Sequence, residues 1–206
     1  MSDEGKPDHG NLVPAQGGYL APVGSSNPLV SRGLVDVEWE IFRFTYIDPL
    51  TGIHNTRYLL EFLEYHLAQS ARHHVPLSLI RLDIDHFKAP NDELGALVGD
   101  YTLRELVTQL KEAIRSKELF ARCGGHEFVV VLPDTDRKYA LQMSERLRHL
   151  AEWYDFHYED WHYKITISLG LVSTEGDESL TPNDLIKQAD EKLYQAKREG
   201  GNRVVA

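Results

Sequence analysis

The sequence predicts an α+β domain whose sheet is mostly antiparallel. Two apolar runs, 119–122 and 127–132, flank Gly124-Gly125, and this arrangement is typical of a β-hairpin. The other apolar patterns alternate between helical and strand periodicity from residue 47 onward. Hairpins mixed with helices favour an α+β architecture. The length of 206 residues allows one such domain and an additional segment.

Each element follows from its periodicity and its end signals. The pattern over 34–46 fits a helix or a strand, and we expect a lead-in helix at 34–47. Asn55 can cap the next helix, while Thr181 and Gly200-Gly201 bound the last one. The expected helices cover 56–74, 97–114, 137–153 and 182–199. The expected strands cover 77–84, 119–122, 127–132, 163–173 and 204–205.

The first 33 residues differ in composition from the rest of the chain. They hold six of the 15 glycines and four of the nine prolines. Such a segment buries too little apolar surface to offset its conformational entropy, so we expect residues 1–33 to form a flexible tail. The alternative is a peptide that binds a partner through its few apolar side chains.

Charge and composition exclude several classes of protein. The 22 basic and 32 acidic residues give a formal net charge of −10, which argues against a protein that coats DNA or RNA. No run approaches the ~20 apolar residues of a membrane span, and the first residues do not resemble a secretory signal. The single cysteine, Cys123, cannot form an internal disulfide. These features indicate a cytoplasmic protein.

Two carboxylates, Asp83 and Asp85, stand at the end of the apolar strand expected over 77–84. Because side chains alternate along a strand, both carboxylates lie on the same face. Carboxylates beside a tight hairpin can bind a hard divalent cation. Taken alone, the pattern is also typical of acids in a solvated turn.

A series of further motifs occurs in order along the chain. They are Asp48-Pro-Leu-Thr-Gly-Ile-His-Asn55, Leu82-Asp-Ile-Asp-His-Phe-Lys88, Asn91-Asp92, Gly99-Asp100, Arg122-Cys-Gly-Gly-His-Glu-Phe128, Ile167-Ser-Leu-Gly170 and Ala189-Asp190 with Tyr194-Gln-Ala-Lys197. Together they resemble the GGDEF domain, the fold of bacterial diguanylate cyclases, over residues 48–206. The resemblance implies a five-stranded, mainly antiparallel sheet flanked by helices, similar to nucleotidyl cyclases and polymerase palms.

The resemblance also implies a reaction and the residues that perform it. Two domains of the family meet face to face, and the 3′-hydroxyl of each bound GTP attacks the α-phosphate of the other. The products are cyclic di-GMP and pyrophosphate, and Mg²⁺ ions neutralise the developing charge. Asp83 matches a metal ligand, and Lys197 matches the lysine that holds the terminal phosphates. Asn91 and Asp100 match the positions that read guanine.

Several positions depart from the family pattern. His126 stands where the signature has Asp or Glu, and neutral imidazole offers Mg²⁺ neither an oxygen nor a negative charge. Gly201 stands where a phosphate-binding arginine is usual, and Pro90 restrains the nucleotide loop. These degenerate positions predict that the domain is not an enzyme, that Mg²⁺ binding is lost, and that the matched nucleotide and metal positions are vestigial. Transition-metal binding through His126 and Asp83 is an alternative.

A second nucleotide site is expected before the hairpin. Many family members carry a product-sensing Arg-x-x-Asp motif five residues ahead of the signature, and Arg115-Ser-Lys-Glu118 has that spacing. Arginine can donate two hydrogen bonds to the O6/N7 edge of guanine. We therefore expect cyclic di-GMP to bind at Arg115, Glu118 and Arg122, which matches a further family position. The alternative is that these charges are the solvated end of a helix.

These observations predict a catalytically inactive, bacterial signalling protein that needs no cofactor. It would bind cyclic di-GMP as a receptor and relay that state to a protein partner. The partner would bind residues 1–46 or the aromatic segment 153–163. The first alternative is an interaction scaffold without nucleotide binding, and the second is a weak diguanylate cyclase.

Overall fold

The computed structural model describes residues 13–15, 19–21, 39–87, 96–176 and 180–206. Two short strands, β1 (Val13–Ala15) and β2 (Tyr19–Ala21), pair with each other in antiparallel orientation. The remainder of the predicted tail 1–33 lies outside the described residues. Of the predicted lead-in helix, residues 39–46 are helical and 34–38 lie outside the described part.

The main sheet has six strands among the described residues, in the order β10-β9-β4-β6-β5-β3. These strands are β3 (His54–Asn55), β4 (Leu77–Ile84), β5 (Leu119–Gly124), β6 (Glu127–Pro133), β9 (Ile167–Thr174) and β10 (Val204–Val205). Each adjacent pair among the four central strands β9, β4, β6 and β5 is antiparallel, whereas the two-residue edge strands β10 and β3 are parallel to β9 and β5. The mainly antiparallel α+β fold is thus confirmed, with one strand more than the five expected.

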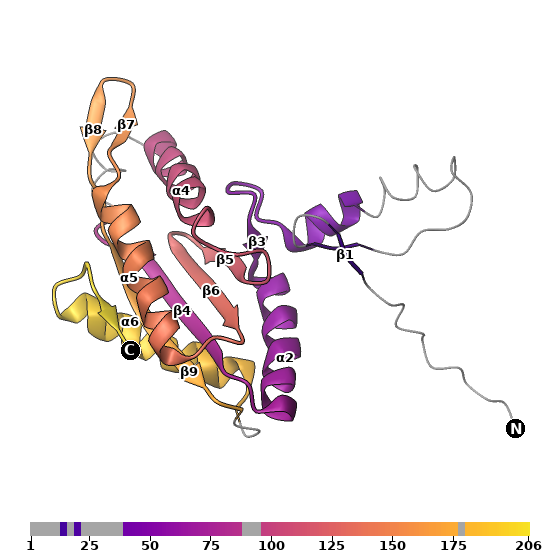
Figure 1. Ribbon diagram of the computed structural model, residues 1–206. Coiled ribbons are helices and arrows are strands. Elements are labelled where there is room, and N and C mark those ends of the chain that lie inside the picture. Colours follow the sequence, from indigo (N-terminus) through magenta and orange to yellow (C-terminus); the bar gives the residue numbers. More distant parts are fainter. Residues whose placement is uncertain (1–12, 16–18, 22–38, 88–95, 177–179) are drawn as a thin grey trace, which may run out of the picture. The chain divides into compact units, whose positions relative to one another are not determined.

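Helices cover both faces of this sheet (Figure 1). They are α2 (Thr56–His73), α4 (Ala96–Lys111), α5 (Arg137–Trp153) and α6 (Pro182–Arg198). The buried side chains Ile80, Leu82 and Ile84 of β4 join a hydrophobic core with α4 and α5. The opposite face of the sheet packs on α6 and α2.

The predicted helix ends are formed by side chains. The Asn55 carboxamide oxygen accepts hydrogen bonds from the backbone N–H groups of Arg57 and Tyr58, which begins α2. Thr181 and Asp184 form a reciprocal capping box at the start of α6. These contacts confirm the predicted starts of both helices.

Two predicted elements differ in extent. The helix expected over 97–114 ends at Lys111. The strand expected over 163–173 is divided, because β8 (Trp161–Tyr163) pairs with β7 (Phe156–Tyr158) in a separate hairpin and β9 starts only at Ile167. Between them, the Lys164 ammonium donates to the carbonyl oxygens of Trp153 and Tyr154, which ties the chain to the end of α5.

Helix α6 lies unusually close to β9 because of one glycine. A Cβ atom at Gly170 would lie 2.2 Å from the carbonyl oxygen of Ala189 and 2.4 Å from the backbone nitrogen of Leu193. Only glycine permits this approach, which fixes α6 against the sheet and so places the side chains near its end. None of the helices in the described ranges is long and apolar enough to cross a membrane.

Candidate functional site

A charged stripe runs along the face of β4 that packs on α6. Arg81 and Asp83 alternate with the apolar Leu82 and Ile84 of β4, and Asp85 continues this alternation one residue after the strand ends. Each member of the stripe meets a different set of partners near the end of β4. The carboxylate pair predicted from the sequence therefore lies on one face, as expected.

Asp83 is the most buried charged residue of this stripe. Its exposed fraction is 3%, and one carboxylate oxygen, Oδ2, accepts a hydrogen bond from the Lys197 ammonium at the end of α6. The other oxygen, Oδ1, is buried and has no hydrogen-bond partner among the described residues. Burial raises the pKa of Asp83, and the ion pair with Lys197 opposes this rise.

His126 faces the open oxygen of Asp83. Its Nε2 atom lies 3.2 Å from Asp83 Oδ1, which is within ion-pair distance but lacks the geometry of a hydrogen bond. The imidazole stacks on Phe87, with ring centroids 5.1 Å apart and an interplanar angle of 27°. Packing therefore directs an imidazole nitrogen toward the carboxylate.

The hairpin that carries His126 is fixed by an arginine at its base. The Arg122 guanidinium donates to the carbonyl oxygen of Gly125 at 2.7 and 3.0 Å and to the carboxylate of Asp48 at 3.0 and 3.2 Å. Burial alone would raise the pKa of Asp48, but hydrogen bonds from Thr51 and Arg122 lower it overall. The turn between β5 and β6 is thus held in one orientation.

Arg81 joins the hairpin to α6. Its Nη2 atom donates to Glu127 at 2.9 Å, and its Nε atom lies 2.7 Å from Asp190 of α6. The second contact is an ion pair without hydrogen-bond geometry. Arg81 was not among the predicted site residues, although a charged residue inside an otherwise apolar strand indicates a specific partner.

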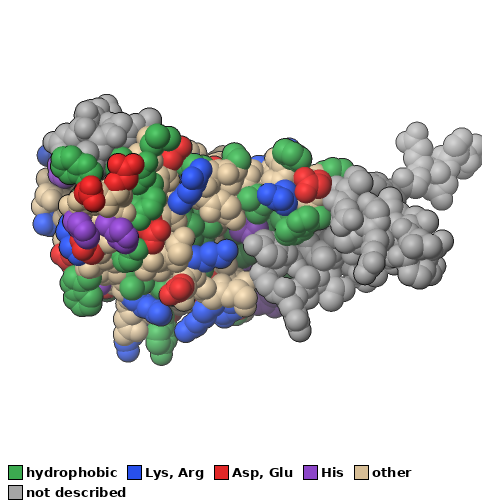
Figure 2. Space-filling view, turned by 90° about the horizontal axis from the view of Figure 1, so that it is seen from above, with side chains coloured by type: hydrophobic (Ala, Val, Ile, Leu, Met, Phe, Trp, Pro, Cys, Tyr) green, Lys and Arg blue, Asp and Glu red, His purple; other side chains and the backbone are tan. Residues whose placement is uncertain are grey.

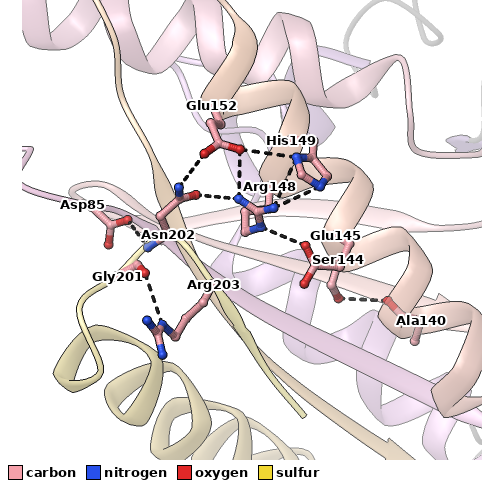
Figure 3. A network of polar contacts seen from close by, with 10 residues as sticks. All are labelled: Asp85, Ala140, Ser144, Glu145, Arg148, His149, Glu152, Gly201, Asn202 and Arg203. Atoms are coloured by element: carbon pink, nitrogen blue, oxygen red, sulfur yellow. Dashed lines mark hydrogen bonds and ion pairs between the residues drawn. The ribbon is translucent and has the colours of Figure 1, made fainter.

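Asp85 fastens the C-terminal turn to the sheet (Figure 3). Its carboxylate accepts hydrogen bonds from the hydroxyls of Thr166 and Ser168, at 2.7 and 2.6 Å, and from the backbone N–H of Asn202 at 2.9 Å. With three donors, this carboxylate has a structural role. The two carboxylates of the stripe therefore differ: both oxygens of Asp85 accept hydrogen bonds, whereas only one oxygen of Asp83 does so among the described residues.

The same turn is held from the other side by α5. Arg148 donates to the Asn202 side chain at 2.8 Å, and both residues bond to Glu152, at 3.0 and 2.7 Å (Figure 3). Gly201, the predicted degenerate position, lies in this turn with a φ of +72°. A Cβ atom there would lie 3.1 Å from the carboxylate of Asp85. Backbone geometry and the neighbouring carboxylate thus both favour glycine.

The other predicted site residues lie elsewhere or outside the description. Asp100 is exposed on α4, and Asn91 lies outside the described residues. The Arg115 side chain is 74% exposed, whereas that of Glu118 is 2% exposed and accepts a hydrogen bond from the backbone N–H of Arg115 at 2.8 Å. The structure therefore brings together Asp83, His126 and Lys197 and leaves the Arg115 turn as a separate feature.

The surroundings of Asp83 fit a divalent cation whose coordination is completed by substrate. A buried carboxylate oxygen without a donor is costly, so Oδ1 of Asp83 favours a cation or water beside it. Mg²⁺ is typically held by one or two carboxylates together with substrate phosphates. Glu127 lies opposite Asp83 in the sheet register and is the second carboxylate in place. Within the described ranges, no three His, Cys, Asp or Glu side chains form a metal site by themselves.

The molecular surface shows no sign of a nucleic-acid-coating face in the view of Figure 2. On that face Lys and Arg side chains are interspersed with Asp and Glu, and histidines lie among them. Such mixed charge agrees with the acidic balance of the whole chain.

Comparisons with known proteins agree with this geometry. The family model described as "Diguanylate cyclase, GGDEF domain" matches residues 45–203. The chain is similar to diguanylate cyclase DgcP of Pseudomonas aeruginosa, with 41% identity over 157 residues, 76% of this chain and 23% of DgcP. The chain thus spans about a quarter of the length of this relative.

Solved structures resemble the fold as well. The GGDEF domain of DgcB from Caulobacter crescentus in complex with c-di-GMP has a TM-score of 0.75 and 27% identity, and covers 78% of this chain and 92% of that chain. Diguanylate cyclase SiaD of Pseudomonas aeruginosa in complex with its activator SiaC has a TM-score of 0.77 and 30% identity, with 86% and 67% covered.

The prediction that the domain is not an enzyme is wrong. Two relatives with 41% and 38% identity are named diguanylate cyclase and probable diguanylate cyclase, and the description of the matching family model names the same activity. The error has a physical reason. The prediction rested on three single positions, His126, Gly201 and Pro90, and Pro90 lies outside the described residues. Asp83, Lys197 and the hairpin that surround the site are all in place.

Proposed function

The chain belongs to the GGDEF domain family of diguanylate cyclases, and from this premise we propose that it binds GTP beside Asp83 and converts two GTP molecules into cyclic di-GMP. Each 3′-hydroxyl would lose its proton and attack the α-phosphate of the other nucleotide. Two new phosphodiester bonds would form, and two pyrophosphates would leave. The reaction requires two copies of the domain, so the active form would be a dimer.

One observation carries this proposal. Asp83 offers a buried oxygen without a hydrogen-bond partner among the described residues, and Lys197 lies on the other oxygen of the same carboxylate. A divalent ion at this oxygen would neutralise charge on the α-phosphate and favour the alkoxide. The ammonium group of Lys197 would swing from Asp83 to the terminal phosphates when the nucleotide binds.

The test is direct conversion of GTP by the purified chain. We expect cyclic di-GMP and pyrophosphate, separated by chromatography, after incubation with GTP and either Mg²⁺ or Mn²⁺. Asp83→Asn should abolish the product, while Asp160→Asn at the tip of the β7–β8 hairpin should not change it. Absence of product with both metals, or equal turnover by Asp83→Asn, would refute the proposal.

A second proposed function is binding of cyclic di-GMP at the Arg115 turn. The Arg115 guanidinium is exposed and can reach a guanine edge. Glu118 is buried and holds the backbone of this turn, so its contribution would be to orient Arg115. Arg122 is the third residue of the proposed site, and it bonds to Asp48 and to the hairpin.

Calorimetry with cyclic di-GMP would test this second site. Arg115→Ala should weaken binding by roughly tenfold or more, because a charge-assisted bidentate contact contributes on the order of 1–3 kcal/mol. Lys138→Ala, an exposed charge on α5, is the matched control. No binding by the unaltered chain, or equal binding by Arg115→Ala, would contradict the site.

We also propose a protein partner for the aromatic segment 153–163. Trp153 is 72% exposed and Trp161 is 58% exposed, and such rings are common anchors of protein interfaces. The other predicted contact region, 1–46, lies mostly outside the described residues. A photo-cross-linker at position 161 should capture a partner that one at position 139, an exposed tyrosine on α5, does not. Equal labelling from both positions would argue against this contact.

A further inference from the structure

The histidine at the third position of the signature gives this site a donor set of its own. We propose that His126 and Asp83 together bind a divalent transition ion of the kind that accepts imidazole nitrogen, such as Co²⁺ or Zn²⁺, in preference to Mg²⁺. The proposal rests on the proposed nucleotide site and specifies its metal. The remaining ligands would be phosphate oxygens of the nucleotide and water.

The separation of the two donor atoms supports a shared ion. Two ligands that each lie about 2.1 Å from one metal ion, at octahedral or tetrahedral angles, are about 3.0–3.4 Å apart. Nε2 of His126 and Oδ1 of Asp83 are 3.2 Å apart. Both atoms can therefore bind one ion with little movement of either side chain.

The orientation and burial of the two groups give independent support. Phe87 stacks on the imidazole and limits its rotation, so Nε2 stays directed at the carboxylate. Asp83 is 3% exposed, and its Oδ1 has no hydrogen-bond partner in the described part of the chain. A buried oxygen of this kind favours a cation close to it. Lys197 occupies Oδ2 and leaves the edge toward His126 open.

The charge around the site also suits a divalent ion. Two cations, Arg81 and Lys197, lie among three carboxylates, those of Asp83, Glu127 and Asp190. One net negative charge remains, and neutral imidazole adds none. A bound divalent ion would therefore be attracted both by this cluster and by the triphosphate of the nucleotide.

Ligand chemistry then sets the preference between metals. Mg²⁺ demands oxygen ligands in a near-ideal octahedron and dehydrates reluctantly. Imidazole suits later first-row metals, whose affinity for nitrogen rises toward the end of the series. Replacing a carboxylate by His126 therefore removes a ligand that Mg²⁺ prefers and supplies one that Co²⁺ and Zn²⁺ prefer.

Metal titrations of the full chain in the presence of GTP test the inference. Co²⁺ binding is followed by visible absorption, and Mg²⁺ competition gives the ratio of the two affinities. We expect His126→Glu to shift this ratio toward Mg²⁺ by at least about tenfold, since even outer-shell changes alter metal affinity about 10–100-fold. His157→Ala, an exposed histidine on β7, should leave the ratio unchanged.

A spectroscopic readout separates this inference from the proposed catalysis. Pulsed electron paramagnetic resonance of Mn²⁺ bound with GTP should show nitrogen coupling from an imidazole, and the coupling should be lost in His126→Glu and in the neutral variant His126→Gln. An unchanged metal ratio, or no nitrogen coupling in the unaltered chain, overturns the metal assignment even if cyclic di-GMP forms. Nitrogen coupling without product would instead leave the assignment standing and refute the catalysis.

Discussion

Acidification should destabilise the domain in part through His54, a histidine at the edge of the sheet. His54 belongs to β3, which pairs with β5 at the base of the hairpin that carries the site. Its ring stacks on Tyr58 with centroids 4.1 Å apart. Burial is the main reason that the pKa of His54 falls from 6.5 to about 4, and the nearby charge of Lys111 adds to it.

The sign and size of the effect follow from this pKa. Because the unfolded state takes up a proton below pH 6.5 and the folded state does so only near pH 4, stability is highest above the unfolded pKa and falls as the pH drops between the two values. A fall of the pKa from 6.5 to about 4 corresponds to at most about 3.4 kcal/mol. Near pH 5 the loss is about 2 kcal/mol, and solvent screening of a half-buried ring reduces it further.

Thermal unfolding of the unaltered chain and of His54→Gln measures this contribution. A loss of about 2 kcal/mol lowers the melting temperature of a domain of this size by roughly 4–8 °C. Between about pH 7.5 and pH 5, we expect the melting temperature of the unaltered chain to fall by this amount more than that of His54→Gln. His157→Gln, an exposed histidine, should behave like the unaltered chain. Parallel losses in all three proteins would refute the assignment of the acid sensitivity to burial of His54.

Three further substitutions probe the site and its supports. Lys197→Ala should lower GTP affinity roughly tenfold or more in a binding assay, because a charged contact to phosphate contributes about 1.5–3 kcal/mol, and Arg198→Ala, one residue along α6, should not. Arg81→Met should lower the free energy of unfolding in urea by about 1–2 kcal/mol. The loss is no larger because the carboxylates of Glu127 and Asp190 are half-exposed and can be hydrated once the arginine is gone. A loss below about 0.5 kcal/mol would show that these ion pairs do not stabilise the fold. Gly201→Arg should lower the melting temperature and fail to raise turnover, and increased turnover would contradict this argument.

The fold was largely predictable because its determinants are local. The caps Asn55 and Thr181 act over a few residues and form the expected contacts. The hairpin also forms at the expected place, but its turn is shifted by one residue: Gly125 and His126 form the turn, and Gly124 ends β5. The division of the strand expected over 163–173 was not predictable in this way. At the division, the Lys164 ammonium donates hydrogen bonds to the carbonyl oxygens of Trp153 and Tyr154 at the end of α5. The alternation of apolar residues along a strand does not predict such a contact.

The site was predictable in its residues but not in its contacts. Asp83 and Lys197 are 114 positions apart, and only the close approach of α6 to β9 at Gly170 brings them together. Arg81 and its partners depend on the same approach. The matched motifs therefore predict which side chains take part in the site, whereas tertiary packing decides which of them share an ion pair.

Gly201 illustrates why a missing side chain is weak evidence against activity. From the sequence, we interpret Gly201 as the loss of an arginine that would bind phosphate. In the structure Gly201 has a positive φ, and the backbone N–H of the next residue, Asn202, donates a hydrogen bond to Asp85. A Cβ atom at position 201 would lie too close to the same carboxylate. The glycine is thus accommodated beside Asp85, which accepts three hydrogen bonds, whereas Asp83, two residues earlier, keeps one oxygen, Oδ1, without a hydrogen-bond partner in the described ranges. Lys197 already lies against Asp83, so we expect this lysine to supply positive charge at the site in place of an arginine.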